Sequence, residues 1–199
     1  MHRHRCIFIH IPKCAGSSIL KALGHTGGRD HVEWRHYQGA NPKWFKHYFK
    51  FAVCRHPFAR LRSVYYYVIS GGNQSSNDLA LKTLIQAKSN SFESFVENVL
   101  NEEFASDNVL FHPQYRYVFN NVGQLMVDNI LRFETLDKEW QAMVNTKGLS
   151  KSALKLNITN KTEDLIKVKT LILSPTQLHK IQHIYRKDFQ LFGYSEEGM

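Results

Sequence analysis

The stretch IFIHIPKCAGSSILKAL, residues 7–23, runs from an apolar segment through a tight turn directly into a helical segment. The apolar run at residues 6–11 predicts a β-strand, and residues 17–23 predict the start of an α-helix. The first N–H groups of a helix have no intrahelical partner, and the helix dipole is positive at that end. A strand that enters a helix through so short a turn therefore predicts an anion-binding site.

The residue types of this turn favour a phosphate-like ligand. Gly16 allows the backbone to approach a ligand, Lys13 supplies a positive charge, and Ser17 and Ser18 supply hydroxyl donors. The order differs from the Walker A pattern G-x-x-x-x-G-K-[ST], because here the lysine precedes the glycine by three residues. The alternative is an ordinary strand-to-helix turn in which Ser17 is the N-cap.

A second strand-to-helix junction carries a similar set of groups. Residues 49–54 predict a strand, Arg55 follows its carboxyl end, and Ser63 lies eight residues later on a predicted helix. Arg55 and Ser63 are expected to reach one phosphate from outside the sheet. In the alternative, Arg60, Arg62 and Ser63 form the solvated face of an amphipathic helix, an interpretation that we accept for Arg62. Two phosphate-type sites at adjacent strand ends suit a ligand with phosphates at both ends of a nucleoside.

The rest of the chain alternates between strand-like and helix-like segments. Residues 70–78 predict a loop, and residues 124–133 predict a further strand. Helices are predicted after Pro57, over residues 91–100, from about Thr135 and after Ser174-Pro175-Thr176. The alternation predicts an α/β fold, a P-loop-like parallel sheet flanked by helices, in a single domain over residues 1–199.

Composition limits the kinds of partner. A chain of 199 residues with 43% apolar content can bury one sizeable core. The formal charge of +9 favours an anionic partner, which includes nucleic acid, a phosphorylated cofactor, an acidic polysaccharide or a membrane surface. Cys6, Cys14 and Cys54 are odd in number and form no spaced framework, so we expect no disulfides and a reducing compartment.

The N-terminus superficially resembles a signal peptide, since basic residues precede an apolar run. That run is only six residues long, too short for a signal peptide, and no stretch approaches the ~18 apolar residues of a membrane span. The alternating His and Arg at residues 2–5 are expected to form a solvated, frayed terminus.

Two longer segments, IFIHIPKCAGSSI and FKFAVCRHPFARLRSVYYY, resemble the paired cofactor motifs of sulfotransferases that use 3′-phosphoadenosine 5′-phosphosulfate (PAPS). The resemblance is to the carbohydrate sulfotransferase branch that includes heparan 2-O-sulfotransferase. Four further segments follow in the usual order of that family: FHPQYRYV, VDNILRFETL, LNITNKT and YRKDFQLFGY. The resemblance implies the sulfotransferase fold and transfer of a sulfuryl group from PAPS to a hydroxyl, with a carbohydrate as the expected acceptor.

The resemblance also assigns the donor site. Arg55 and Ser63 are implied to hold the 3′-phosphate, and Lys161 and Thr162 to lie near the cofactor. The Golgi members carry a transmembrane anchor and a stem, which this chain lacks, so we expect either a cytoplasmic bacterial protein or a trimmed catalytic domain from the Golgi lumen. The 5′-phosphosulfate is implied to be held by Pro12, Lys13, Cys14, Ala15, Gly16, Ser17 and Ser18.

Sulfuryl transfer needs a cation at the leaving phosphate oxygen and a base at the acceptor hydroxyl. Lys13 fits the first role, and no metal is expected, because the transferred group is less charged than a phosphoryl group. Histidine is the usual base at neutral pH, and in the family a histidine between the two motifs acts as base. The segment DHVEWRHY matches best at His31 and second at His36. His112 is expected either to line the acceptor pocket or to be a structural histidine.

Two other functions remain as alternatives. A P-loop-type ATP-dependent kinase is supported by LMVD, which imitates a Walker B strand ending at Asp128, but the G-K-[ST] spacing is missing. A nucleic-acid-binding module fits the charge, yet the sequence has no helix-turn-helix, zinc-finger or RNP pattern, and we expect no nucleic-acid partner. The identity of the acceptor, the position sulfated and the oligomeric state stay open.

Overall fold

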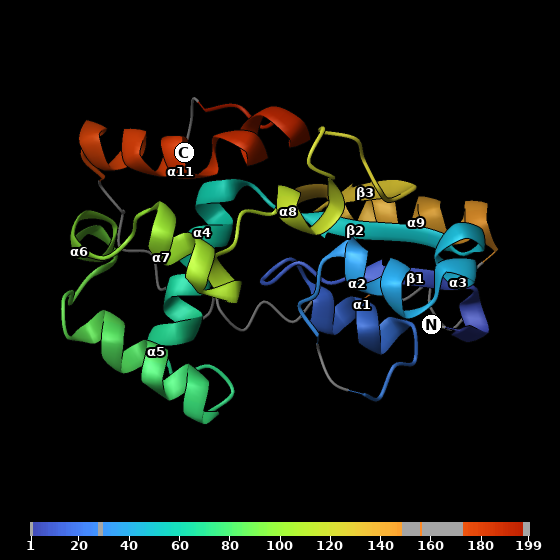
Figure 1. The fold of residues 1–199 in the computed structure, drawn as a ribbon, viewed down its shortest axis with the longest axis horizontal. Helices are drawn as coiled ribbons and strands as arrows, with labels where there is room; N and C mark the ends of the chain where they lie inside the picture. The colour runs from blue at the N-terminus through green and yellow to red at the C-terminus, as the bar shows by residue number, and fades with distance from the viewer. Residues whose placement is uncertain (1, 28–29, 149–155, 157–172, 197–199) are drawn as a thin grey trace. The chain divides into compact units, whose positions relative to one another are not determined.

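The computed structural model describes residues 2–27, 30–148, 156 and 173–196 (Figure 1). These residues gather into two compact units. The first unit draws on residues 1–56 and 114–159, and the second on residues 57–113 and 160–199. Lys13, His31 and Arg55 all belong to the first unit.

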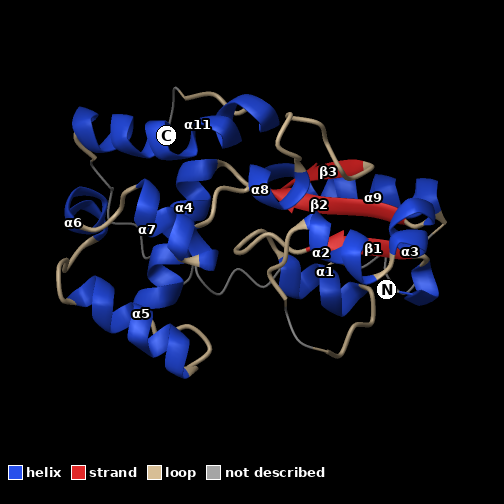
Figure 2. Cartoon of the chain, viewed as in Figure 1, coloured by secondary structure: helices blue, strands red, loops and turns tan. Residues whose placement is uncertain are grey.

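The described part of the first unit is built on a three-stranded parallel sheet, drawn in red in Figure 2. The strands are β1 (Cys6–Ile9), β2 (Phe49–Cys54) and β3 (Asn129–Arg132), in the order β1-β2-β3. In the central strand, residues 51–54 are all buried, as expected of a parallel strand covered on both faces. The predicted α/β fold with a parallel sheet flanked by helices is therefore confirmed.

Helices of the first unit flank the sheet (Figure 2). Asn41 caps α3 by accepting a 2.9 Å hydrogen bond from the Trp44 backbone N–H. On α9, the buried Trp140 ring packs 5.9 Å from the ring of Phe51 in the central strand. These elements are η1 (His2–His4), α1 (Gly16–Ala22), α2 (Trp34–Ala40), α3 (Pro42–His47), α8 (Tyr115–Val118), η3 (Phe133–Thr135) and α9 (Leu136–Lys147).

The described residues of the second unit form helices around an aromatic core. Tyr65 packs 5.2 Å from Phe95, and Phe58 packs 5.8 Å from Phe189. Neither the 18-residue α11 nor any other described helix is long and apolar enough to cross a membrane. The elements are α4 (Pro57–Ile69), α5 (Ser76–Gln86), α6 (Phe92–Asn98), α7 (Glu102–Asp107), η2 (Val109–Phe111) and α11 (Pro175–Phe192).

Two predicted segments have different bounds. The loop predicted at 70–78 ends early, because Ser75 accepts a 3.1 Å bond from the Asp78 N–H and caps α5. Polar residues that suit a loop also suit a helix cap, which is why the sequence pattern predicts a longer loop than the structure has. The strand predicted at 124–133 is shorter, since only Asn129–Arg132 pair with β2, while Leu125 forms an isolated bridge with Phe119.

Arg60 is fully buried in the second unit, so the alternative that placed it on a solvated helix face is wrong. Its guanidinium donates to the carbonyls of Leu110 (3.1 Å) and His112 (2.8 Å) and lies 5.6 Å from the Tyr185 ring centroid. Ser63 is buried as well, and Arg62 is half-buried. Carbonyls at the end of a short helical turn need donors, and Arg60 supplies them.

Replacement of Arg60 tests this role in stability. Arg60→Met keeps a similar side-chain length but removes both bonds to the Leu110 and His112 carbonyls. We expect the free energy of unfolding to fall by about 2–4 kcal/mol, measured by urea denaturation. Arg62→Met on the same helix is the matched control and should change it by less than about 0.5 kcal/mol. Equal losses in the two variants would contradict the role.

Candidate active site

The turn between β1 and α1 has an unusual backbone. Lys13 and Ala15, neither of them glycine, adopt left-handed conformations with φ of 63° and 59°. Backbone N–H groups in such a turn form a concave site that suits an anion. Ala15 is the N-cap of α1 and provides no side-chain cap, so the alternative in which Ser17 caps the helix is wrong. Ser17 lies exposed within α1, and Ser18 is buried there.

Gly16 is needed because an imidazole ring occupies the space beside it. A Cβ atom at Gly16 would lie 1.7 Å from Nε2 of His10, a distance that no side chain tolerates. His10 is only 5% exposed and stacks on Phe8, with ring centroids 5.6 Å apart. The strand that enters the turn and the helix that leaves it are thereby packed through one ring.

His31 lies beside this turn, as the prediction of a base in the site requires. Its ring centroid is 4.3 Å from that of His10, and its Nδ1 is 3.1 Å from the His10 carbonyl oxygen. His31 is half-buried, in the segment between α1 and α2. His36, the second candidate, is exposed on α2. The geometry therefore brings His31 to the turn through His10.

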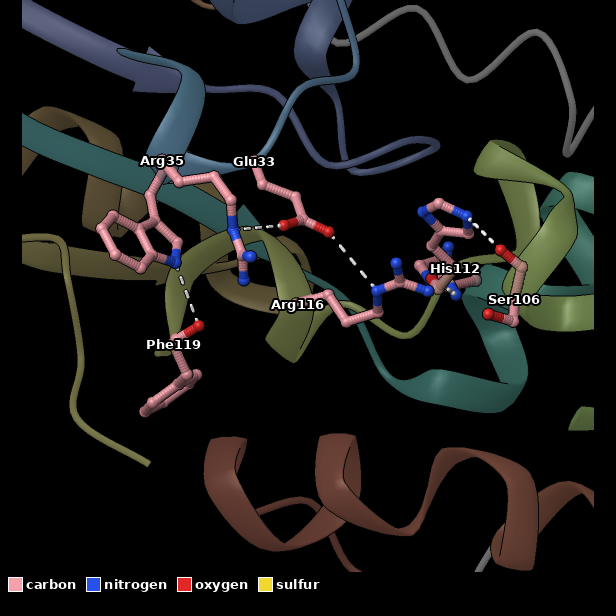
Figure 3. Close-up of polar contacts among 8 residues, drawn as sticks. Glu33, Arg35, Ser106, His112, Arg116 and Phe119 are labelled. Carbon is pink, nitrogen blue, oxygen red and sulfur yellow. Dashed lines mark hydrogen bonds and ion pairs between the residues drawn. The ribbon is translucent and has the colours of Figure 1, made fainter. Parts of the chain in front are cut away.

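The segment that follows His31 is fixed by polar contacts that sequence analysis missed (Figure 3). One carboxylate oxygen of Glu33 lies 2.9 Å from Nε of Arg35, and the other lies 3.4 Å from Nε of Arg116. The indole N–H of Trp34 donates to the Phe119 carbonyl at 3.1 Å. Arg116 and Phe119 lie 83 and 85 residues away from their partners in the chain, so no local pattern could have indicated the contacts.

A depression of about 300 Å³ adjoins this segment. An aromatic ring, a guanidinium and amide side chains are the groups that hold sugars and other hydroxyl compounds, by stacking and hydrogen bonding. The lining residues are Trp34, Arg35, Asn120, Asn121 and Val122.

Gln114 joins the two predicted phosphate motifs. Its side chain is fully buried, and its Oε1 accepts from the Arg55 backbone N–H at 2.9 Å and from Sγ of Cys14 at 3.4 Å. Its Nε2 donates to the Arg55 carbonyl at 2.8 Å. One amide thus fixes the end of β2 and contacts the turn after β1. The segment FHPQ contains Gln114, but the sequence pattern draws attention only to its histidine.

Arg55 lies at the carboxyl end of β2, as predicted, and is 8% exposed. Its guanidinium carbon is 4.1 Å from the Phe133 ring centroid, a cation–π geometry that orients the side chain. Ser63 belongs to α4 of the second unit, so its joint contact with Arg55 on one phosphate stays a prediction. Lys161 and Thr162 lie outside the described residues.

His112 belongs to the second unit and has a defined structural contact. Its Nε2 lies 2.8 Å from the Ser106 carbonyl oxygen (Figure 3), and its own carbonyl accepts from Arg60. Of the two expectations for His112, this contact favours the structural one.

The structure is an α/β protein in which a turn with left-handed backbone joins the first parallel strand to a helix. The chain belongs to the sulfotransferase family, whose model matches residues 1–195. A search of curated proteins and a search of solved structures each find no match. The predicted sulfotransferase is confirmed at the level of the family, and the kinase and nucleic-acid-binding alternatives lose their support.

Replacement of Gln114 tests whether it holds the site together. Gln114→Leu leaves the N–H and C=O of Arg55 buried without partners, at about 1–3 kcal/mol each. We expect a loss of about 2–5 kcal/mol in the free energy of unfolding, measured by urea denaturation. The exposed Gln141→Leu is the control, with less than about 0.5 kcal/mol expected. If the two variants unfold alike, Gln114 has no such role.

Proposed function

We propose that this sulfotransferase moves a sulfuryl group from PAPS to a hydroxyl of a carbohydrate, as its resemblance to the heparan 2-O-sulfotransferase branch suggests. One observation carries the proposal: a half-buried histidine, His31, is hydrogen-bonded at the base of a cationic, left-handed turn. A base and an anion-binding turn are the two groups that sulfuryl transfer requires. The family match to residues 1–195 supports the same chemistry.

The residues of the turn suit the donor's anionic end. Their left-handed backbone and the Lys13 ammonium favour a phosphosulfate over a neutral group. Arg55 supplies a guanidinium for the 3′-phosphate, together with Ser63, and the resemblance also assigns Lys161 and Thr162 to the neighbourhood of the cofactor. PAPS, when bound, supplies an activated sulfuryl group on a phosphate leaving group. The 5′ end is held by Pro12, Lys13, Cys14, Ala15, Gly16, Ser17 and Ser18.

The tautomer of His31 follows from its partner. A carbonyl oxygen only accepts, so the contact with the His10 oxygen requires a proton on Nδ1 of His31. The neutral ring then carries its basic lone pair on Nε2. Nε2 takes the proton of the acceptor hydroxyl as its oxygen attacks sulfur and the sulfur–phosphate oxygen bond breaks. Lys13 stabilises the negative charge that develops on the leaving phosphate oxygen.

The acceptor side is expected along the segment that follows His31. The depression beside Trp34 and Arg35 offers an aromatic face and polar groups for a sugar. His36 stays as a further acceptor candidate, whereas the contact of His112 with the Ser106 carbonyl favours a structural role over its acceptor role. An acidic carbohydrate also accounts for the formal charge of +9 without a nucleic-acid partner.

Nucleotide selectivity tests the donor. We expect 3′-phosphoadenosine 5′-phosphate to raise the melting temperature without magnesium, and Mg-ATP to raise it much less, because a ligand selective for the folded state stabilises it by mass action. Arg55→Ala should erode the preference for this nucleotide over adenosine 5′-phosphate, which lacks the 3′-phosphate. Stronger stabilisation of the wild type by Mg-ATP would refute the PAPS assignment.

The base is tested by a pair of histidine variants. His31→Asn retains an N–H donor for the His10 carbonyl but lacks a basic nitrogen, so transfer should fall by about 10²- to 10⁴-fold. Binding of 3′-phosphoadenosine 5′-phosphate, measured by thermal shift, should stay unchanged. His36→Ala is the control: at saturating acceptor it should keep most of the transfer rate, because its proposed role is contact with the acceptor and not proton transfer. An active His31→Asn variant with an inactive His36→Ala variant would move the base to His36.

A further inference from the structure

Basic residues gather at the amino ends of the strands, the end of the sheet away from the Lys13 turn. Two depressions lie there, of about 520 Å³ and about 450 Å³, and they share Arg5 and His47. Elements far apart in the chain meet at this edge: η1 precedes β1, α3 precedes β2, and α9 ends there with Lys147. We call this surface the amino-edge patch; it consists of His2, Arg3, His4, Arg5, Lys43, Trp44, His47, Tyr48, Phe49, Lys147 and Gly148.

The amino-edge patch has an uncompensated positive charge. No aspartate or glutamate lines either depression among the described residues. Arg3, Arg5, Lys43 and Lys147 are exposed, and the ion pairs found in the described part of the chain involve other residues. Four fixed positive charges that share one edge create a potential that attracts anions over an extended surface.

Aromatic contacts order the patch, in contrast to the frayed terminus predicted for residues 2–5. The Trp44 and Tyr48 rings stack at 5.7 Å with an interplanar angle of 5°, and the His2 ring lies 4.7 Å from Trp44. Nζ of Lys147 sits 4.7 Å from the Phe49 ring centroid. Arg5 adopts a left-handed φ of 47° as the chain passes from η1 into β1. The cations are thus held on a preorganised surface.

We propose that the amino-edge patch binds an acidic polysaccharide chain outside the catalytic site. This inference rests on the proposed function, in which the acceptor is a carbohydrate. Guanidinium groups match carboxylates and sulfates, and Trp44, 47% exposed, offers an apolar face to a sugar ring.

The distance to the catalytic turn sets the kind of acceptor. Arg5 and His10 are five positions apart along extended chain, about 16 Å at the rise of a β-strand. A polysaccharide can contact both places, whereas a single sugar cannot. Binding at the patch raises the local concentration of acceptor hydroxyls at the turn. The patch therefore selects for polymeric, anionic acceptors.

Binding to heparin, a sulfated polysaccharide, tests the proposal. The probe is end-labelled heparin, followed by fluorescence anisotropy at about 50 mM salt, where surface charges are weakly screened. The patch variant combines Arg3→Gln, Arg5→Asn and Lys147→Gln; asparagine is chosen because it tolerates a left-handed φ. A matched control combines Lys88→Gln, Lys138→Gln and Arg186→Gln, which removes the same charge from other exposed positions.

We expect the dissociation constant for heparin to rise at least about tenfold in the patch variant and less than about twofold in the control. Circular dichroism should show both variants folded. Equal weakening in the two variants, or unchanged binding in the patch variant, would overturn the proposal. Tighter binding of single-stranded DNA than of heparin, lost in the patch variant, would overturn it in favour of a nucleic-acid surface.

A transfer assay separates this proposal from the proposed function. The patch variant should retain sulfate transfer to a disaccharide acceptor and lose the preference of the wild type for a polysaccharide. If the wild type transfers no sulfate to any carbohydrate, the proposed function fails, while patch-dependent heparin binding in the absence of PAPS still stands as a separate result.

Discussion

The buried amide of Gln114 is the contact on which the geometry of the site depends. Its two polar atoms satisfy the backbone N–H and C=O of Arg55 and also meet the Cys14 thiol. A backbone segment that leaves the sheet loses its ladder partners, and a buried unpaired amide costs about as much as a lost hydrogen bond. Gln114 replaces those partners at the point where β2 ends. Any ligand held by both motifs therefore relies on this side chain.

A second contact, between His10 and Gly16, connects His31 to the turn. Because the His10 ring lies where a Cβ of residue 16 would be, the helix begins close to the strand that precedes it. The His10 carbonyl then fixes both the position and the tautomer of His31. Glu33 and Trp34 secure the same segment from its other side. The position of the His31 ring is thus set by groups that lie outside the turn.

Local patterns predicted much of the fold. The central strand at residues 49–54 and the helix after Pro57 appear where hydrophobicity and proline placed them. The missed features depend on distant partners: Gln114 acts 59 residues from Arg55, and Arg60 acts 50 residues from Leu110. A polar residue in a sequence window has no visible partner, so it is assigned to solvent or to a ligand. Contacts formed only by the tertiary fold cannot be read from such a window.

The turn itself shows how these constraints combine. Left-handed conformations cost a non-glycine residue about 1–3 kcal/mol, and here Lys13 and Ala15 both adopt them. Such conformations persist only where surrounding contacts hold the backbone in place. Here the His10–Gly16 packing and the Cys14–Gln114 contact hold the turn next to Lys13 and Ala15. Glycine at position 13 would relieve the strain but would remove the cation. The fold thus holds a lysine at a backbone position that glycine would occupy with less strain. A turn that must supply both backbone N–H groups and a positive charge to an anion needs this arrangement.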